Sequence, residues 1–244
     1  YYVKKYDNAK KKYITVATVE ASSYTIKNLK AGENYNYAVC AFVKAAEGKL
    51  SSSESKISCS TDPSKVTGLK QSSSSSGTVT LKWNKVSNAS SYTVYKYNAK
   101  TKKYEKFKTV TKNTLKIKQN AASSVKYRVR AVTKTKWGDN YGANSAVLTA
   151  TAGPKKVSVK LSNAGKGRVK ISWDKVNGAT HYEIYRARSG EFKKVATIDA
   201  AYKSFTNINL RSGVKYQYRV RAVKTVGKIN AYGSYCDKLT IKTK

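Results

Sequence analysis

Apolar and polar residues alternate along several short segments of the chain. Two of these segments, Thr78 to Asn84 and Arg168 to Asp174, carry apolar residues at every second position. The apolar positions are Val79, Leu81, Trp83, Val169, Ile171 and Trp173. A period of two puts alternate side chains on one face of a β-strand, so the pattern predicts half-buried strands. No segment keeps the 3.6-residue period of an amphipathic helix, and we expect an all-β fold.

The strand pattern recurs along the chain at a spacing of about 90 residues, which indicates an array of similar domains. Trp83 recurs as Trp173 and Tyr92 as Tyr182. The only two prolines, Pro63 and Pro154, follow Thr-rich stretches, where a break between domains is expected. We therefore predict three units: unit one at 1–62, unit two at 63–152 and unit three at 153–244.

Unit one is shorter than the other two. Tyr1 aligns with Tyr92, so the segments that hold the first two strands and the Trp of unit two have no counterpart in unit one. We expect unit one to lack those two strands and to have them supplied by upstream sequence or by another molecule. In the second case each subunit would complete the next, and the contact would propagate into a fibre.

The units resemble the fibronectin type III family. The resemblance is carried by a Trp in the second strand, a Tyr in the third, and Leu-x-x-Gly-x-x-Tyr followed by Tyr-x-Val-x-Ala. The Leu, Gly and Tyr positions are Leu29, Gly32 and Tyr35 in unit one, and Leu210, Gly213 and Tyr216 in unit three. The resemblance implies tandem antiparallel β-sandwiches of the fibronectin type III and immunoglobulin-like kind.

Several structural roles follow from the same resemblance. It implies that Trp83 and Trp173 lie in the core and that Tyr35 and Tyr216 form tyrosine corners, whose hydroxyls bond to the chain just upstream. Unit two has Val125 at the corner position, so we expect its corner to be looser. The repeat motifs Lys-Val-x-x-Ala-x-x-Tyr and Ala-Tyr-Gly-Ser-Tyr are similar to those of large secreted or surface proteins of Gram-positive bacteria. This resemblance implies an extracellular location.

The charge of the chain is strongly unbalanced. Lys and Arg number 49 against 13 Asp and Glu, a net charge of +36. Such an excess is either a solvated coat that also protects exposed strands or a surface for anionic cell-wall polymers and glycans. The cations expected on one outward face are Lys126, Arg128, Arg130, Lys134, Arg219, Arg221 and Lys224.

The residues offer little for catalysis. There is a single histidine, His181, and unit two has only Glu105 and Asp139 as acids, which argues against a carboxylate pair in each unit. The three cysteines lack the paired spacing of zinc sites. We expect a non-enzymatic protein with no cofactor and no metal, and no apolar run reaches the roughly 20 residues of a membrane span.

The leading hypothesis is a non-catalytic extracellular spacer and adhesion array with a basic surface for anionic polymers. One alternative is an accessory glycan-binding module of a secreted polysaccharide-degrading enzyme, with Trp137, Tyr141 and Tyr232 stacking on sugar rings. Another is a subunit of an extracellular fibre, bound to a neighbouring subunit or another protein partner. Nucleic acid is expected to bind only without sequence specificity.

Overall fold

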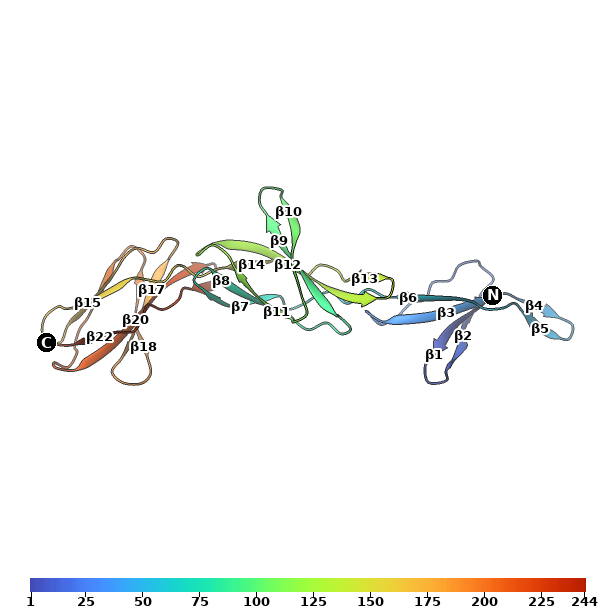
Figure 1. Cartoon of the computed structure of the whole chain (residues 1–244), viewed down its shortest axis with the longest axis horizontal. Helices are drawn as coiled ribbons and strands as arrows, with labels where there is room; N and C mark the ends of the chain where they lie inside the picture. The colour runs from blue at the N-terminus through green and yellow to red at the C-terminus, as the bar shows by residue number, and fades with distance from the viewer.

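A computed structural model describes all residues from 1 to 244, and every regular element in it is a β-strand. The strands form three groups that follow one another along the long axis of the molecule (Figure 1). All pairings between strands are antiparallel, so the predicted all-β class is confirmed. No helix has the length and apolar character needed to cross a membrane.

The first group lies within unit one and has one main sheet, ordered β2-β1-β3-β6, with a separate β4-β5 hairpin. Its strands are β1 (Tyr2–Asp7), β2 (Lys12–Thr18), β3 (Asn34–Cys40), β4 (Phe42–Ala45), β5 (Gly48–Ser51) and β6 (Ser55–Ser60).

The second group lies within unit two and has two sheets. One is ordered β10-β9-β12-β13, with β14 also paired to β12, and the other is ordered β11-β8-β7. Its strands are β7 (Lys70–Ser75), β8 (Thr78–Lys82), β9 (Ser91–Asn98), β10 (Lys103–Val110), β11 (Thr114–Lys118), β12 (Ser124–Thr135), β13 (Gly138–Tyr141) and β14 (Leu148–Thr151).

The third group lies within unit three and repeats this arrangement. One sheet is ordered β18-β17-β20-β21, with β22 paired to β20, and the other is ordered β15-β16-β19. Its strands are β15 (Val159–Asn163), β16 (Val169–Trp173), β17 (His181–Ala187), β18 (Lys193–Asp199), β19 (Ser204–Asn207), β20 (Lys215–Val226), β21 (Ile229–Tyr232) and β22 (Leu239–Lys242). The unit boundaries at 62/63 and 152/153 stay predictions.

A separate apolar core lies between the two sheets of unit two and of unit three. Trp83 is 1% exposed and packs edge-on to Tyr92, with 5.4 Å between ring centroids. Trp173 is 5% exposed and lies 5.1 Å from Tyr182. Every second side chain of these strands therefore faces the core, as the alternation in the sequence predicts. A Trp–Tyr pair lies within each core.

Tyrosine hydroxyls fix the chain beside the cores. The hydroxyl of Tyr35 accepts a hydrogen bond from the Lys30 amide (2.9 Å), and that of Tyr216 accepts one from the Arg211 amide (3.2 Å). In unit two, where the corner residue is Val125, Gln119 bonds to the Ser123 carbonyl at 2.8 Å. The Gln119 side chain also accepts a bond from the hydroxyl of Tyr127 (3.1 Å), so a different residue holds this corner.

Unit one has no second sheet facing the inner side of its main sheet. Apolar side chains remain accessible there, with Val39 38% and Ile57 64% exposed. Together with Tyr24, Ile26 and Tyr37 they line a hollow of about 320 Å³. The equivalent faces of units two and three are covered by the β11-β8-β7 and β15-β16-β19 sheets.

The junction between units two and three is closely packed. The Gly153 amide donates to the Ser75 carbonyl (3.0 Å), and the Gly153 carbonyl accepts from the amide of Gly77 (3.2 Å). Further on, Ser76 Oγ donates to the Pro154 carbonyl (2.7 Å), and the Tyr232 amide donates to Ser74 Oγ (2.9 Å). Because these bonds join both sides of the boundary, the two units are held in one orientation.

The junction between units one and two has fewer bonds. Asn140, on β13, donates from Nδ2 to Ser60 Oγ at 2.8 Å. Gly142 allows close approach here, because a Cβ added to it would lie 2.5 Å from the Pro63 carbonyl oxygen. This contact is specific but smaller than the one between units two and three.

Candidate functional site

The cations predicted to share an outward face lie mostly on the two long strands β12 and β20. Tyr127, Val129 and Ala131 are buried in the core, so Lys126, Arg128 and Arg130 project from the opposite side of the sheet. Arg219 and Arg221 occupy the same side of β20. This outer face of each large sheet is the candidate site.

In unit three the outer face carries a buried acid. Glu183, 5% exposed on β17, lies directly opposite Arg221 in the strand register. Its carboxylate accepts hydrogen bonds from Arg221 Nε (2.7 Å), Lys194 Nζ (3.0 Å) and the Tyr185 hydroxyl (3.0 Å). The Arg221 guanidinium also lies 4.0 Å from the ring centroid of Tyr232. Arg221 is therefore neutralised within the protein.

These contacts shift the ionisation of the cluster. Burial by itself would raise the pKa of Glu183, but the hydrogen bonds from Lys194 and Arg221 outweigh it and hold the pKa below its ordinary value. For Tyr185, burial raises the pKa of the phenol, so the hydroxyl stays protonated and donates to the carboxylate. The cluster is a satisfied ion pair with no group poised for proton transfer.

Replacing Glu183 with Gln leaves Arg221 half-buried without its counter-ion. We expect the variant to lose about 2 to 3 kcal/mol of unfolding free energy at neutral pH. Because the folded pKa lies below the ordinary 4.5, this contribution is present above pH 4.5 and is lost as the pH falls through the folded pKa. Urea unfolding of both proteins between pH 3 and 7 measures it, and a difference that stays constant with pH contradicts the assignment.

Three predicted members of the cationic row have contacts that remove them wholly or partly from the outer face. Lys224 lies outside the row because its ammonium donates to the Ala122 carbonyl of unit two, across the junction. Lys134 lies opposite Asp139 in the β12-β13 hairpin, beyond the body of the sheet. Arg130 donates from Nε to the Gly142 carbonyl at 2.7 Å, so its guanidinium is partly used inside the unit.

The three predicted stacking residues do not form one platform. Trp137 is 52% exposed at the β12-β13 turn, and the Lys136 ammonium lies 4.6 Å from its ring centroid. Tyr141 lies under the Arg130 guanidinium at 5.0 Å, and Tyr232 under that of Arg221. Tyr232 also belongs to the junction through its amide, which leaves Trp137 as the freely exposed ring of the three.

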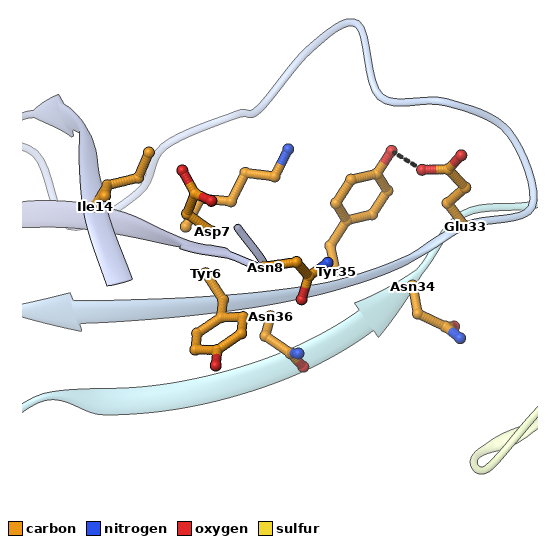
Figure 2. A pocket seen from close by; sticks show the side chains of 9 residues that line it. Tyr6, Asp7, Asn8, Ile14, Glu33, Asn34, Tyr35 and Asn36 are labelled. Atoms are coloured by element: carbon orange, nitrogen blue, oxygen red, sulfur yellow. Dashed lines mark hydrogen bonds between the residues drawn. The ribbon is translucent and has the colours of Figure 1, made fainter. Parts of the chain in front are cut away.

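A polar hollow of about 310 Å³ lies in unit one between β1 and β3 (Figure 2). The Asp7 carboxylate there accepts bonds from the amides of Ala9 and Lys10, and these bonds hold the pKa of Asp7 below its ordinary value. The Tyr35 hydroxyl donates to Glu33 Oε2 at 3.3 Å, as the dashed line marks. The same hydroxyl accepts the bond from the Lys30 amide that forms the tyrosine corner. The Asp7 carboxylate and the Tyr35 hydroxyl of this hollow are thus occupied by turn and corner bonds.

The remaining chemistry-bearing side chains are dispersed. His181, at the start of β17, has Nδ1 3.2 Å from the Thr180 hydroxyl, and burial lowers its pKa. The three cysteines are free, and no three His, Cys, Asp or Glu side chains come together in a metal-binding group.

The aromatic residues that surround the cations of unit two were not predicted from the sequence. Tyr97 on β9 and Tyr104 on β10 are directly paired, and their ring centroids lie 5.2 Å apart on the outer face. The Arg128 guanidinium lies 4.3 Å from the Tyr104 centroid, and the Lys126 ammonium 5.7 Å from that of Tyr97. Tyr95 and Tyr97 alternate with the core-facing positions of β9, and this pattern could have predicted aromatic rings on the outer face.

One stretch of the chain matches a known family of β-sandwich domains. Residues 152–232 match the family model described as "Fibronectin type III domain". Among solved structures, the three fibronectin domains FN1-FN3 of chicken CNTN1 align over 100% of this chain and 91% of theirs, with 17% identity and a TM-score of 0.46. A two-domain fibronectin type III segment of chicken tenascin aligns over 75% of this chain and all of its own, with 14% identity and a TM-score of 0.38.

Relatives in sequence are large bacterial enzymes. Amylopullulanases of Thermoanaerobacterium saccharolyticum and Thermoanaerobacterium thermosulfurigenes are each 35% identical over 82 residues, which is 33% of this chain. That of Thermoanaerobacter thermohydrosulfuricus is 30% identical over 95 residues. The matched part spans only 6%, 4% and 6% of the three enzymes, so the similarity concerns one module of each.

Proposed function

We propose that this chain is a non-catalytic accessory array of a secreted, polysaccharide-acting protein, which it links to the polymer outside the cell. The observation that carries the proposal is the shared module in three amylopullulanases, where it makes up a few per cent of a glycoside hydrolase. A module of that size inside a large enzyme serves the catalytic part by spacing it or by holding it on the substrate.

The geometry supports both of these roles. Hydrogen bonds on both sides of Gly153 and Pro154 hold units two and three in one orientation, which gives a spacer a defined length. The outer faces of the large sheets bring tyrosine rings and cations to the surface, and these groups suit sugar rings and their anionic substituents. The array thus offers a stiff spacer with a contact surface along its side.

A second candidate is an adhesive spacer at the cell surface, favoured by the net charge of +36. Its partners would be anionic cell-wall polymers, attracted by the basic units over a distance set by the ionic strength. The fibre alternative relies instead on the open apolar face of unit one, where Val39 and Ile57 are exposed.

Retention on particles separates these candidates. The full chain is mixed with insoluble starch, pectin, chitin and purified bacterial wall, and the bound fraction is measured beside a basic protein of similar size and charge. We expect retention on at least one polysaccharide above that of the control. Binding to wall alone favours the adhesive spacer, and retention on none of the polysaccharides overturns the proposed link to the polymer.

A further inference from the structure

Four side chains form a continuous patch on the outer face of unit two, which we call the Tyr-Arg patch: Tyr97, Tyr104, Lys126 and Arg128. Tyr104 lies opposite Tyr97 in the β9-β10 register. The neighbouring strand β12 brings Arg128 opposite Tyr95 and places Lys126 beside Tyr97. Two rings and two cations are therefore joined by direct contacts across three strands.

The positive charge of the patch has no acidic partner. Unit two has only two acids, and none of the ion pairs in the protein involves this unit. Glu105 is occupied by Asn98 Nδ2 (2.9 Å) and Thr101 Oγ1 (2.7 Å), and Asp139 lies in the β12-β13 hairpin. The Nε of Arg128 is buried and has no hydrogen-bond partner. An anion from outside the protein would meet an uncompensated guanidinium.

Unit three shows that the fold does not require this arrangement. The positions equivalent to Tyr97 and Lys126 hold Ala187 and Gln217, which are paired in the β17-β20 register. Where unit two has Thr93, unit three has Glu183, which neutralises Arg221, the equivalent of Arg130. The equivalent of Arg128 is Arg219, which lies over the Phe192 ring and has no acidic partner either. Unit three therefore keeps one cation over one ring, and the second ring and second cation of the patch are particular to unit two.

We propose that the Tyr-Arg patch binds a polysaccharide that carries carboxylates, such as a chain of uronic acids. The half-buried tyrosine rings offer their accessible apolar edges to the sugar rings, and Arg128 and Lys126 bind the carboxylates through charge-assisted hydrogen bonds. This inference rests on the proposed accessory role and assigns to it a ligand class and a location.

The geometry favours a glycan over single-stranded nucleic acid. Stacked bases need ring faces that are free and nearly parallel. Here the planes of Tyr97 and Tyr104 are inclined at 59°, and the Arg128 guanidinium lies over the Tyr104 ring. The patch therefore suits ring edges and carboxylates better than a ladder of bases.

The test uses the full chain and calorimetric titration with three probes at low and moderate salt: polygalacturonate, neutral pullulan and single-stranded DNA. The variants are Arg128→Gln and Lys126→Gln, and the matched control is Arg219→Gln. Arg219 occupies the equivalent position in unit three, with its guanidinium 4.6 Å from the Phe192 centroid. Lys126 is exposed, so its variant keeps the fold even where Arg128→Gln is destabilised.

We expect polygalacturonate to bind the parent chain, with affinity about 10-fold lower in Arg128→Gln, clearly lower in Lys126→Gln and within about twofold in Arg219→Gln. Equal losses in all three variants, or DNA binding with the same dependence on Arg128, overturn the patch as a glycan site. Pullulan binding without polygalacturonate binding overturns this inference and leaves the accessory role standing. Retention on no polysaccharide overturns both this inference and the proposed link to the polymer.

Discussion

Replacing Trp173 with Ala is expected to lower the unfolding free energy of unit three by about 3 to 5 kcal/mol. The side chain fills the space between the two sheets at 5% exposure and packs against Tyr182, so its removal leaves a cavity that the surrounding strands cannot close. Calorimetry of the full chain should resolve the loss as a transition lowered by roughly 12 °C or more, since a unit of this size shifts about 4 to 8 °C per kcal/mol.

Trp173→Phe is the matched control for this change. The indole N–H of Trp173 is buried without a hydrogen-bond partner, so Phe keeps an aromatic ring and removes an unsatisfied donor. We expect Phe to retain most of the stability that Ala loses. An unchanged transition in Trp173→Ala contradicts the placement of this side chain between two packed sheets.

Replacing Gly153 with Ala is expected to open the junction between units two and three. A Cβ at this position would overlap the backbone carbonyl of Tyr232, so the Gly153 backbone must shift and lose its bonds to Ser75 and Gly77 of unit two. Loss of the bonds made by Gly153, Ser76 and Tyr232 should cost on the order of 2 to 4 kcal/mol. Small-angle scattering should then report a broader range of orientations, and proteolysis should increase near Pro154.

Gly227→Ala provides the control for the junction. Gly227 has φ of 57° and no atom within 4 Å of an added Cβ, so Ala there introduces backbone strain without touching the boundary. We expect a loss of about 1 kcal/mol and an unchanged scattering curve. If Gly153→Ala scatters like the parent chain, the hydrogen bonds of the junction do not set its geometry.

The strands and their inward faces were predictable because they depend on local alternation. Val79, Leu81 and Trp83 follow one another at every second position, and the spacing between Trp83 and Trp173 identifies the repeat. The Leu-Gly-Tyr phrase in units one and three likewise located the corner tyrosines. These patterns lie within one strand or one turn, where residues that are close in the sequence are also close in space.

The candidate site was only partly predictable, because its chemistry depends on register between strands. Arg130 and Arg221 occupy equivalent positions, yet Arg130 donates to the Gly142 carbonyl while Arg221 pairs with Glu183 from a neighbouring strand. The predicted row also misplaced Lys224, whose partner Ala122 lies in the preceding unit. The junction bond between Ser74 and Tyr232 joins residues 158 positions apart, for which the sequence carries no local signal.

Linking the chain to a catalytic domain measures whether the array serves a polysaccharide-acting enzyme. The chain is fused to an amylase and, separately, to a polygalacturonase, each lacking a binding module of its own. Hydrolysis is compared on insoluble particles and on short soluble substrates. Because binding raises the local concentration of enzyme only at a surface, we expect at least one fusion to act faster on particles and equally on soluble substrate. Equal rates with and without the chain on both kinds of particle would contradict the proposed function.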